Sequence, residues 1–202
     1  MEEIDRVGIR ALVPYYGEWG ENQTLIYSLE GDIFCYPHGM RNFLQLFVRQ
    51  QELDLYQLRK KYGELLQKRN GIPLPLGFYL VLIPVKLREP IAKGDGAYGY
   101  VVLEQVEKIE EESKQGVFYL QGGLRIPTLW SKKVLHQQLL YGRLVQQAYE
   151  QEQRRKFDLY YTASPEFFSV QEPMEILASF ADLSYNKDKM KYALLCRKNK
   201  LL

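Results

Sequence analysis

The apolar pattern over the first 36 residues is that of β-strands. Two segments there are rich in β-branched and aromatic residues, which pack well on a pleated sheet, and glycines separate them. The segments are RVGIRALVPYYG (6–17) and QTLIYSLEGDIFCY (23–36). We therefore expect an opening pair of strands with turns at Gly17, Gly20 and Gly31.

The pattern changes to a helical period between residues 55 and 66. Apolar residues recur there at i, i+3, i+7, i+10 and i+11: Leu55, Leu58, Tyr62, Leu65 and Leu66. Gly63 interrupts this amphipathic helix, and the Asn-Gly pair at 70–71 ends it. At about 100° per residue, Lys60, Lys61 and Lys68 point away from the apolar stripe, so the core does not require them.

A run of strands follows, joined by short turns. The strand segments are GFYLVLIPVKL, AYGYVVLEQVEKI, GVFYLQ and LRIPTL, with a hairpin at Gly122-Gly123. This spacing leaves no room for the crossovers that parallel strands need, so the sheet should be antiparallel. The pattern predicts an α+β fold, in which an antiparallel β-rich domain, a sheet or a sandwich, is flanked by two or three helices.

A long helix is expected after Trp130. Ser131 is a good N-cap, and apolar residues at helical spacing continue toward EQEQRRK (150–156). The remaining chain begins with the aromatic segment FDLYYTASPEFF and holds a short helical pattern, EPMEILASFADL. We predict a β-rich DNA-binding domain with flanking helices over residues 1–156. Residues 157–202 are predicted to form a helical, basic tail for regulation or oligomerisation.

One short stretch resembles a nucleotide-binding loop. In KGDGAYGYVV (93–102), Gly94, Gly96, Gly99 and Val101 have the G-x-G-x-x-G-x-V spacing that covers ATP phosphates in protein kinases. A kinase also needs catalytic and Mg²⁺-binding aspartates, but the sequence has neither an H-R-D nor a D-F-G motif. A Rossmann turn would lead into a helix, whereas the residues after Gly96 favour a strand. We expect a turn that connects two strands.

Other enzymatic constellations are incomplete. Cys35 and His38 in CYPH have a spacing that two metal ligands could use, but no local motif supplies two more. Serine or cysteine nucleophiles would have only two histidines as bases and show no signature. We expect a protein that is not an enzyme and that needs no cofactor or metal.

The composition of the chain indicates which class of protein it belongs to. The chain has 202 residues, 46% of them hydrophobic and 26% charged, like an ordinary globular protein. No apolar run approaches the roughly 18 residues of a membrane span, and the start MEEIDR is unlike a signal peptide. We expect a cytoplasmic protein without a membrane partner, in which two cysteines do not form a disulfide framework.

Charge is uneven although the net charge is only +2. Residues 41–69 hold seven basic and three acidic side chains, residues 131–156 six and two, and residues 186–202 six and one. Outward lysines and arginines neutralise DNA phosphates and release counterions. Lys68, Lys132 and Lys133 are candidate DNA contacts on this basis. The alternative is a β-rich protein-interaction module with solubilising helices and no nucleic-acid role.

The order of several short motifs resembles the ComK family of competence transcription factors. The resemblance covers roughly residues 8–165. The motifs are ALVPYYGEWG, DIFCY, LYQLRKKYG, GIPLP, YLVLIPVKL followed by YGYVV, GVFYLQGGLRIPTLWS and the aromatic KFDLYY.

The resemblance implies a bacterial transcription activator that binds paired A/T-rich half-sites in double-stranded DNA as a homo-oligomer. It also implies control by a proteolytic adaptor, for which we expect the tail residues Phe157, Leu159 and Tyr160 to be contacts. The DNA contacts implied by the matching motifs are Arg59, Lys60, Lys61, Lys86 and Arg88, with Lys93 on the glycine turn. Whether the target is competence or another regulon is left open.

Overall fold

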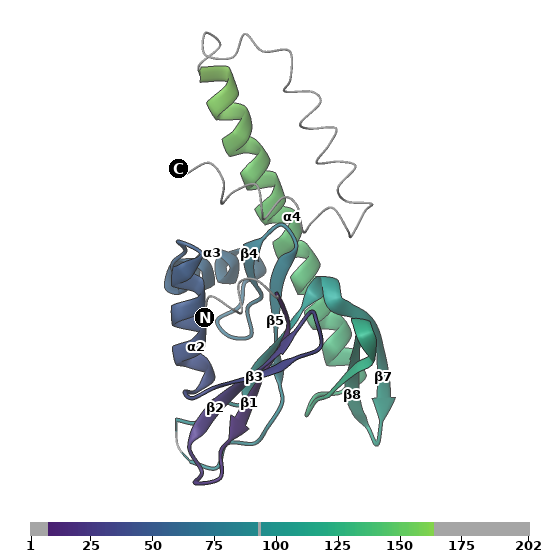
Figure 1. Cartoon of the computed structure of the whole chain (residues 1–202). Coiled ribbons are helices and arrows are strands. Elements are labelled where there is room, and N and C mark those ends of the chain that lie inside the picture. Colours follow the sequence, from purple (N-terminus) through teal and green to yellow (C-terminus); the bar gives the residue numbers. More distant parts are fainter. Residues whose placement is uncertain (1–7, 93, 164–202) are drawn as a thin grey trace. The chain divides into compact units, whose positions relative to one another are not determined.

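The computed structural model describes residues 8–92 and 94–163, with side chains as far as Asp158 (Figure 1). The chain divides into two compact units, residues 1–154 and 155–202. Both β-sheets and two of the three described helices lie wholly in the first unit.

The larger sheet, sheet A, has six antiparallel strands in the order β3-β2-β1-β6-β5-β4. Its strands are β1 (Ile9–Tyr16), β2 (Asn22–Ser28), β3 (Ile33–Tyr36), β4 (Leu74–Gly77), β5 (Leu80–Lys86) and β6 (Tyr98–Val102). The two predicted opening segments therefore form three strands, because the turn at Gly31 divides the second segment into β2 and β3.

The smaller sheet, sheet B, has three antiparallel strands in the order β7-β8-β9. They are β7 (Val106–Glu112), β8 (Gln115–Leu120) and β9 (Leu124–Pro127). The segment AYGYVVLEQVEKI, predicted as one strand, is two, because the 3₁₀ turn η1 (Leu103–Gln105) sends β6 and β7 to different sheets. The predicted hairpin at Gly122-Gly123 is confirmed in η2 (Gln121–Gly123), where both glycines have positive φ.

Sheet A is the central layer of the first unit because its strands are apolar on both faces. Leu82 and Tyr100 belong to one buried cluster, with the apolar residues of α2 and α3. Val81, Ile83 and Val101, their neighbours along the strands, belong to a second cluster with sheet B. Successive strand residues point to opposite faces, so one sheet builds two cores. Figure 1 shows α2 and α3 on one side of β1 and sheet B on the other.

The described helices are α2 (Met40–Gln50), α3 (Leu55–Leu66) and α4 (Lys132–Ala163). The prediction of α3 is confirmed: the Asp54 side chain caps its start, and Gln67 ends it in the left-handed conformation. α4 begins after Ser131, as expected, but runs past residue 156, so the expected boundary of the tail falls inside a helix. The predicted helix within 172–183 lies outside the described residues.

The predicted α+β class, an antiparallel β-rich domain with flanking helices, is confirmed. In the part of the chain that the structure describes, none of the helices combines the length and apolar character needed to cross a membrane.

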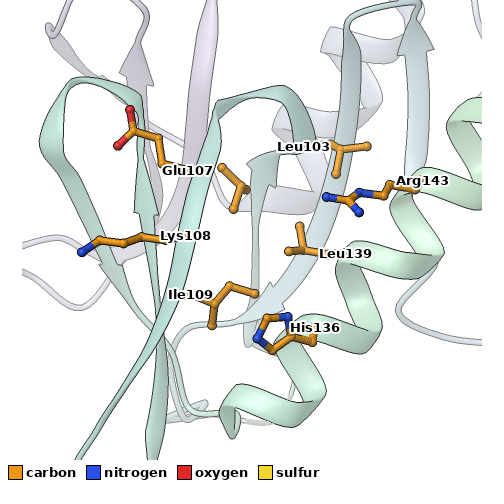
Figure 2. A pocket seen from close by; sticks show the side chains of 8 residues that line it. Leu103, Glu107, Lys108, Ile109, His136, Leu139 and Arg143 are labelled. Atoms are coloured by element: carbon orange, nitrogen blue, oxygen red, sulfur yellow. The ribbon is translucent and has the colours of Figure 1, made fainter.

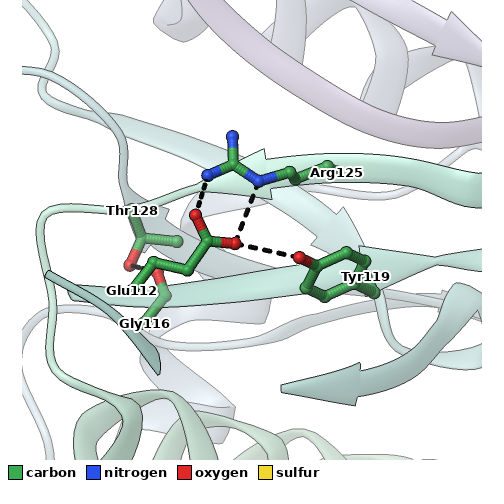
Figure 3. A network of polar contacts seen from close by, with 5 residues as sticks. All are labelled: Glu112, Gly116, Tyr119, Arg125 and Thr128. Atoms are coloured by element: carbon green, nitrogen blue, oxygen red, sulfur yellow. Dashed lines mark hydrogen bonds and ion pairs between the residues drawn. The ribbon is translucent and has the colours of Figure 1, made fainter. Parts of the chain in front are cut away.

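Side-chain bonds fix the outer face of sheet B (Figure 3). Arg125, on β9, forms an ion pair with Glu112 on β7, and the same carboxylate accepts a 2.9 Å hydrogen bond from the Tyr119 hydroxyl on β8. The three strands are thereby joined across their width. The Thr128 hydroxyl donates a 2.7 Å bond to the Gly116 carbonyl and ties the exit of β9 to β8.

Candidate nucleic-acid interface

Helices α2 and α3 form a unit, residues 40–66, in which a four-residue turn joins two helices. Figure 1 shows α3 running across the end of α2 rather than alongside it. Glu52, in the turn, has a φ of 57°, the left-handed conformation that glycine adopts most easily. Leu53 packs against the larger core and anchors the turn. Two helices joined by a turn of this length are the elements from which a helix-turn-helix is built.

Apolar packing holds this α2–α3 unit on sheet A. The α2 side chains of Phe43 and Val48 are fully buried, and Tyr62 of α3 is 1% exposed. Burial, and to a smaller degree Glu152 and Tyr149, raises the pKa of Tyr62, so its phenol is neutral at any physiological pH. The unit is therefore held by its inner face, and its outer face is not needed for packing.

The outer face of α3 is polar and aromatic, with Lys60 in its second turn and the exposed Glu64 one turn further on. Tyr56 is 69% exposed, and Gln57 and Lys60 are exposed beside it. Among the described residues, none forms a hydrogen bond, ion pair or ring contact with Lys60. Lys60 is thus a cation of α3 that has no partner among the described residues. Lys61 instead forms an ion pair with Glu152 of α4.

Two further basic residues predicted here have partners. The guanidinium of Arg59 reaches the Tyr100 hydroxyl on β6 at 3.5 Å, so it braces α3 against sheet A. Lys68 lies beyond the last residue of α3, and its ammonium is 4.1 Å from the centre of the Tyr141 ring on α4. Burial lowers the pKa of Lys68. Lys68 therefore does not share the exposed face of Lys60.

A second group of predicted residues lies at the end of β5. The Lys86 ammonium forms a 2.6 Å ion pair with Glu89. The guanidinium of Arg88 lies 3.8 Å from the centre of the Tyr16 ring, donates a 2.8 Å bond to the Gly96 carbonyl, and bonds to Asn22. Arg88 thus holds the β5–β6 loop in place. Lys93 lies outside the described residues.

Lys132 and Lys133 begin α4 close to this second group. The Leu129 amide, three residues before Lys132, donates a 2.9 Å bond to the Lys86 carbonyl. Lys133 is exposed and Lys132 half-buried. The predicted DNA-contacting residues that the structure describes therefore form two groups, one on and after α3 and the other near the end of β5.

The β5–β6 connection (87–97) joins two strands, as predicted for the glycine-rich stretch. Gly94 has a φ of 102°, which suits glycine, and a Cβ on Gly99 would lie 2.4 Å from the Leu12 carbonyl oxygen. The Asp95 carboxylate accepts a 2.9 Å bond from the Ala92 amide. Gly94 therefore allows the turn, and Gly99 allows β6 to approach β1 closely. The Ala92 amide, which a phosphate could otherwise bind, is already bonded to Asp95.

The predicted tail contacts lie in the last turns of α4. Phe157 is 39% exposed, and Leu159 and Tyr160 are helical, with side chains outside the described part. Cys35, considered above as a metal ligand, is exposed, with its sulfur 3.0 Å from the Gln23 side-chain oxygen. Within residues 8–92 and 94–163, histidine, cysteine and acidic side chains do not gather in any group of three suited to a metal ion.

A hollow of about 220 Å³, which the sequence did not predict, lies between β7 and α4 (Figure 2). Its lining is Leu103, Val106, Glu107, Lys108, Ile109, His136, Leu139 and Arg143. Figure 2 shows Ile109, Leu139 and His136 turned toward the hollow, whereas Lys108 points away from it. Two apolar side chains and the His136 ring therefore face the hollow.

Sequence reasoning missed α2, and with it the exposed start of α3. The missed signal was apolar spacing at i, i+3, i+4, i+7 and i+8: Met40, Phe43, Leu44, Phe47 and Val48. Had α2 been assigned, the short link to α3 would have indicated a helix-turn-helix, and Tyr56 and Gln57 would have joined the candidates.

Comparisons of the chain with protein-family models, with curated proteins and with solved structures each gave no match. The function is therefore inferred from the chain's own geometry.

Proposed function

We propose that the protein binds duplex DNA and that α3 is the helix that enters a groove. The observation that carries this proposal is the crossed α2–α3 unit, whose second helix is held from behind and exposes Tyr56, Gln57 and Lys60 in its first two turns. In helix-turn-helix proteins, the N-terminal residues of the second helix contact base edges while the first helix crosses the backbone.

The chemistry of the unit suits this placement. Lys60 is a point charge without a partner in the part of the chain that the structure describes, and it can neutralise a phosphate. Arg41 and Arg49, at the two ends of α2, are exposed and can contact the backbone on the flanks. A glutamine such as Gln57 can bond in a bidentate manner to adenine in the major groove. Together these groups supply both affinity and a preference for A/T-containing sites.

The proposal extends to a cytoplasmic transcription activator that acts on paired A/T-rich half-sites as an oligomer, without catalysis. The similarity of the motif order over residues 8–165 to the ComK family supports this extension. On this proposal a proteolytic adaptor would bind near Phe157, Leu159 and Tyr160.

A second candidate function is a protein-interaction module. Trp19 and Ile91 favour it, since they are 91% and 78% exposed on neighbouring loops at one end of sheet A. The Ile91 amide donates a 2.9 Å bond to the Tyr16 hydroxyl, so the two loops are joined. The flanking side chains Glu18, Glu21 and Glu89 would repel DNA phosphates.

The deciding experiment is a salt titration of binding to labelled A/T-rich and random-sequence duplexes by fluorescence anisotropy. We expect the parent to bind at low salt, and Lys60→Ala to reduce the slope of log K against log salt by about 0.9, the effect of one lost phosphate contact. Lys108→Ala removes the same charge from the outer face of sheet B and serves as the matched control. A parent that binds neither duplex at low salt would rule out the proposal in favour of the interaction module.

A further inference from the structure

The outermost face of α4 carries a stripe without charge. Its members are Gln137, Leu140, Leu144, Gln147 and Gln151, at alternating spacings of three and four residues. All five are exposed, including Leu140 at 58% and Leu144 at 51%. Alternating spacings of three and four are those of the contact positions of a coiled coil.

The rest of α4 packs on the protein's own body. Leu135 and Val145 are fully buried in the two cores, and Tyr141 lies under Lys68. At about 100° per residue, the stripe falls on the side of the helix away from these buried residues. It spans about 21 Å at 1.5 Å per residue, long enough for a helix-to-helix contact of four turns.

One flank of the stripe carries two charged residues of opposite sign, Arg143 and Glu150. Arg143 lines the hollow shown in Figure 2, and its guanidinium has no hydrogen bond or ion pair with any described residue. Glu150 lies two turns further along the same flank, beside Glu104. The rise between Arg143 and Glu150 is about 10.5 Å, which is too far for them to pair within one helix.

Glu150 lies close to a second carboxylate, that of Glu104. One carboxylate oxygen of Glu104 accepts a 2.9 Å bond from Gln146, and its other oxygen is buried without a partner among the described residues. Burial, and in addition the charge of Glu150, raises the pKa of Glu104. A cation brought to this flank from outside would relieve the repulsion between the two carboxylates.

We propose that α4 pairs antiparallel with α4 of a second copy of the chain along this stripe. An antiparallel two-fold arrangement repeats each contact twice, so Arg143 of each copy meets Glu150 of the partner subunit. The glutamine amides both donate and accept, so the stripe is complementary to itself. In this register the two-fold axis passes midway between residues 143 and 150, beside Gln147. Leu140 and Leu144 then pack against the aliphatic stems of the partner's glutamines on either side of the axis.

The chemistry of the stripe favours a second copy over other occupants. Five positions without a cation cannot neutralise DNA phosphates or release counterions. Three glutamines among the five make the face too polar for insertion into a lipid surface. An uncharged helix face with opposite charges one heptad apart on its flank matches another helix of the same sequence in the antiparallel direction. The pairing does not depend on the proposed DNA binding.

Sedimentation equilibrium of the full chain over a range of protein concentrations tests the pairing. We expect the parent to dimerise and Leu140→Glu/Leu144→Glu to remain monomeric at concentrations where the parent is dimeric. Leu65→Glu, at an exposed leucine of α3, is the matched control and should dimerise like the parent. Circular dichroism checks that each variant keeps its helices. A parent that is monomeric throughout, or a double variant that dimerises like the parent, overturns the proposal.

A charge exchange tests the antiparallel direction. Arg143→Glu places two acids opposite each other and should raise the dimer dissociation constant by about tenfold or more. Arg143→Glu/Glu150→Arg restores opposite charges across the two-fold axis and should return the constant to within about threefold of the parent. Failure of this rescue overturns the antiparallel pairing of Arg143 with Glu150.

Discussion

The Tyr16 hydroxyl donates a 2.7 Å hydrogen bond to the Asp95 carboxylate, which lies 79 positions further along the chain. The same carboxylate accepts a 2.8 Å bond from the Asn22 side chain and a 2.9 Å bond from the Ala92 amide. These bonds, first the one from Tyr16, favour the charged form and lower the pKa of Asp95 to about 2. Asp95 therefore fastens the β5–β6 loop to the β1–β2 hairpin.

We expect this fastening to depend on pH. Because the pKa of Asp95 is lower in the folded protein than its ordinary value of 3.8, its contribution to stability is complete above about pH 5. The contribution is lost as the pH falls toward 2. Thermal unfolding of the parent and Asp95→Asn should therefore show a higher midpoint for the parent at pH 6 and converging midpoints near pH 2. A difference between the two proteins that does not change with pH would contradict this assignment.

Gly96, in the same loop, and Gly99, in the strand β6 that follows it, should differ in their tolerance of a side chain. A Cβ on Gly99 would lie 2.4 Å from both the Leu12 carbonyl oxygen and a Leu87 methyl group, so Gly99→Ala should destabilise the fold by about 1–3 kcal/mol. A Cβ on Gly96 meets no atom within 4 Å, so Gly96→Ala should leave stability unchanged or raise it by about 0.4–1 kcal/mol. Urea denaturation measures both, and equal losses would show that the loop is constrained in some other way.

The strands could be predicted from the sequence because a run of apolar, β-branched residues is a local signal. Val81, Leu82 and Ile83 indicate a strand buried on both faces whatever lies around them. The break at η1 could not be predicted in this way, since Leu103 is as apolar as its strand neighbours and only the presence of two sheets decides where β6 ends.

The sequence also could not show which of the predicted DNA-contacting residues form bonds within the fold. Lys60 and Lys61 are adjacent and chemically alike, but only Lys61 meets an acid on α4, 91 positions away. The sequence predicted Arg88 to be an exposed cation. Its partners Tyr16 and Asn22 are far from it in the chain, so a local pattern does not reveal them. Pairings of this kind follow from the packing of distant segments, which no local pattern encodes.

Glu104 should limit stability at neutral pH. Burial raises its pKa above the ordinary value of 4.5, so the ionised form is disfavoured in the fold and the stability loss develops as the pH rises past 4.5. Glu104→Gln removes the buried charge and keeps an oxygen for the bond from Gln146. We expect its midpoint to exceed that of the parent at pH 7, with the gap closing below about pH 4. Glu107→Gln, at an exposed residue, is the control. A Glu104→Gln midpoint below that of the parent at pH 7 would show that the carboxylate is stabilising.

Arg88 offers a test that separates a DNA contact from a structural brace. Its guanidinium stacks on Tyr16 and donates to Gly96 and Asn22, and a lysine cannot reproduce this planar set of donors. Arg88→Lys should therefore lower stability by about 1–3 kcal/mol, the magnitude of lost hydrogen bonds to a charged group. Because lysine keeps the positive charge, a role limited to phosphate contact would leave stability unchanged.

The DNA titration completes this test. If Arg88 is a brace, Arg88→Lys and Arg88→Ala should both retain the parent's salt slope under conditions where they are folded. A phosphate contact at Arg88 would instead reduce the slope of Arg88→Ala alone by about 0.9. Lys133→Ala provides the comparison for the same end of sheet A, since Lys133 is an exposed cation at the start of α4. A reduced slope for Arg88→Ala with unchanged stability would move the DNA-contacting surface from α3 to the end of β5.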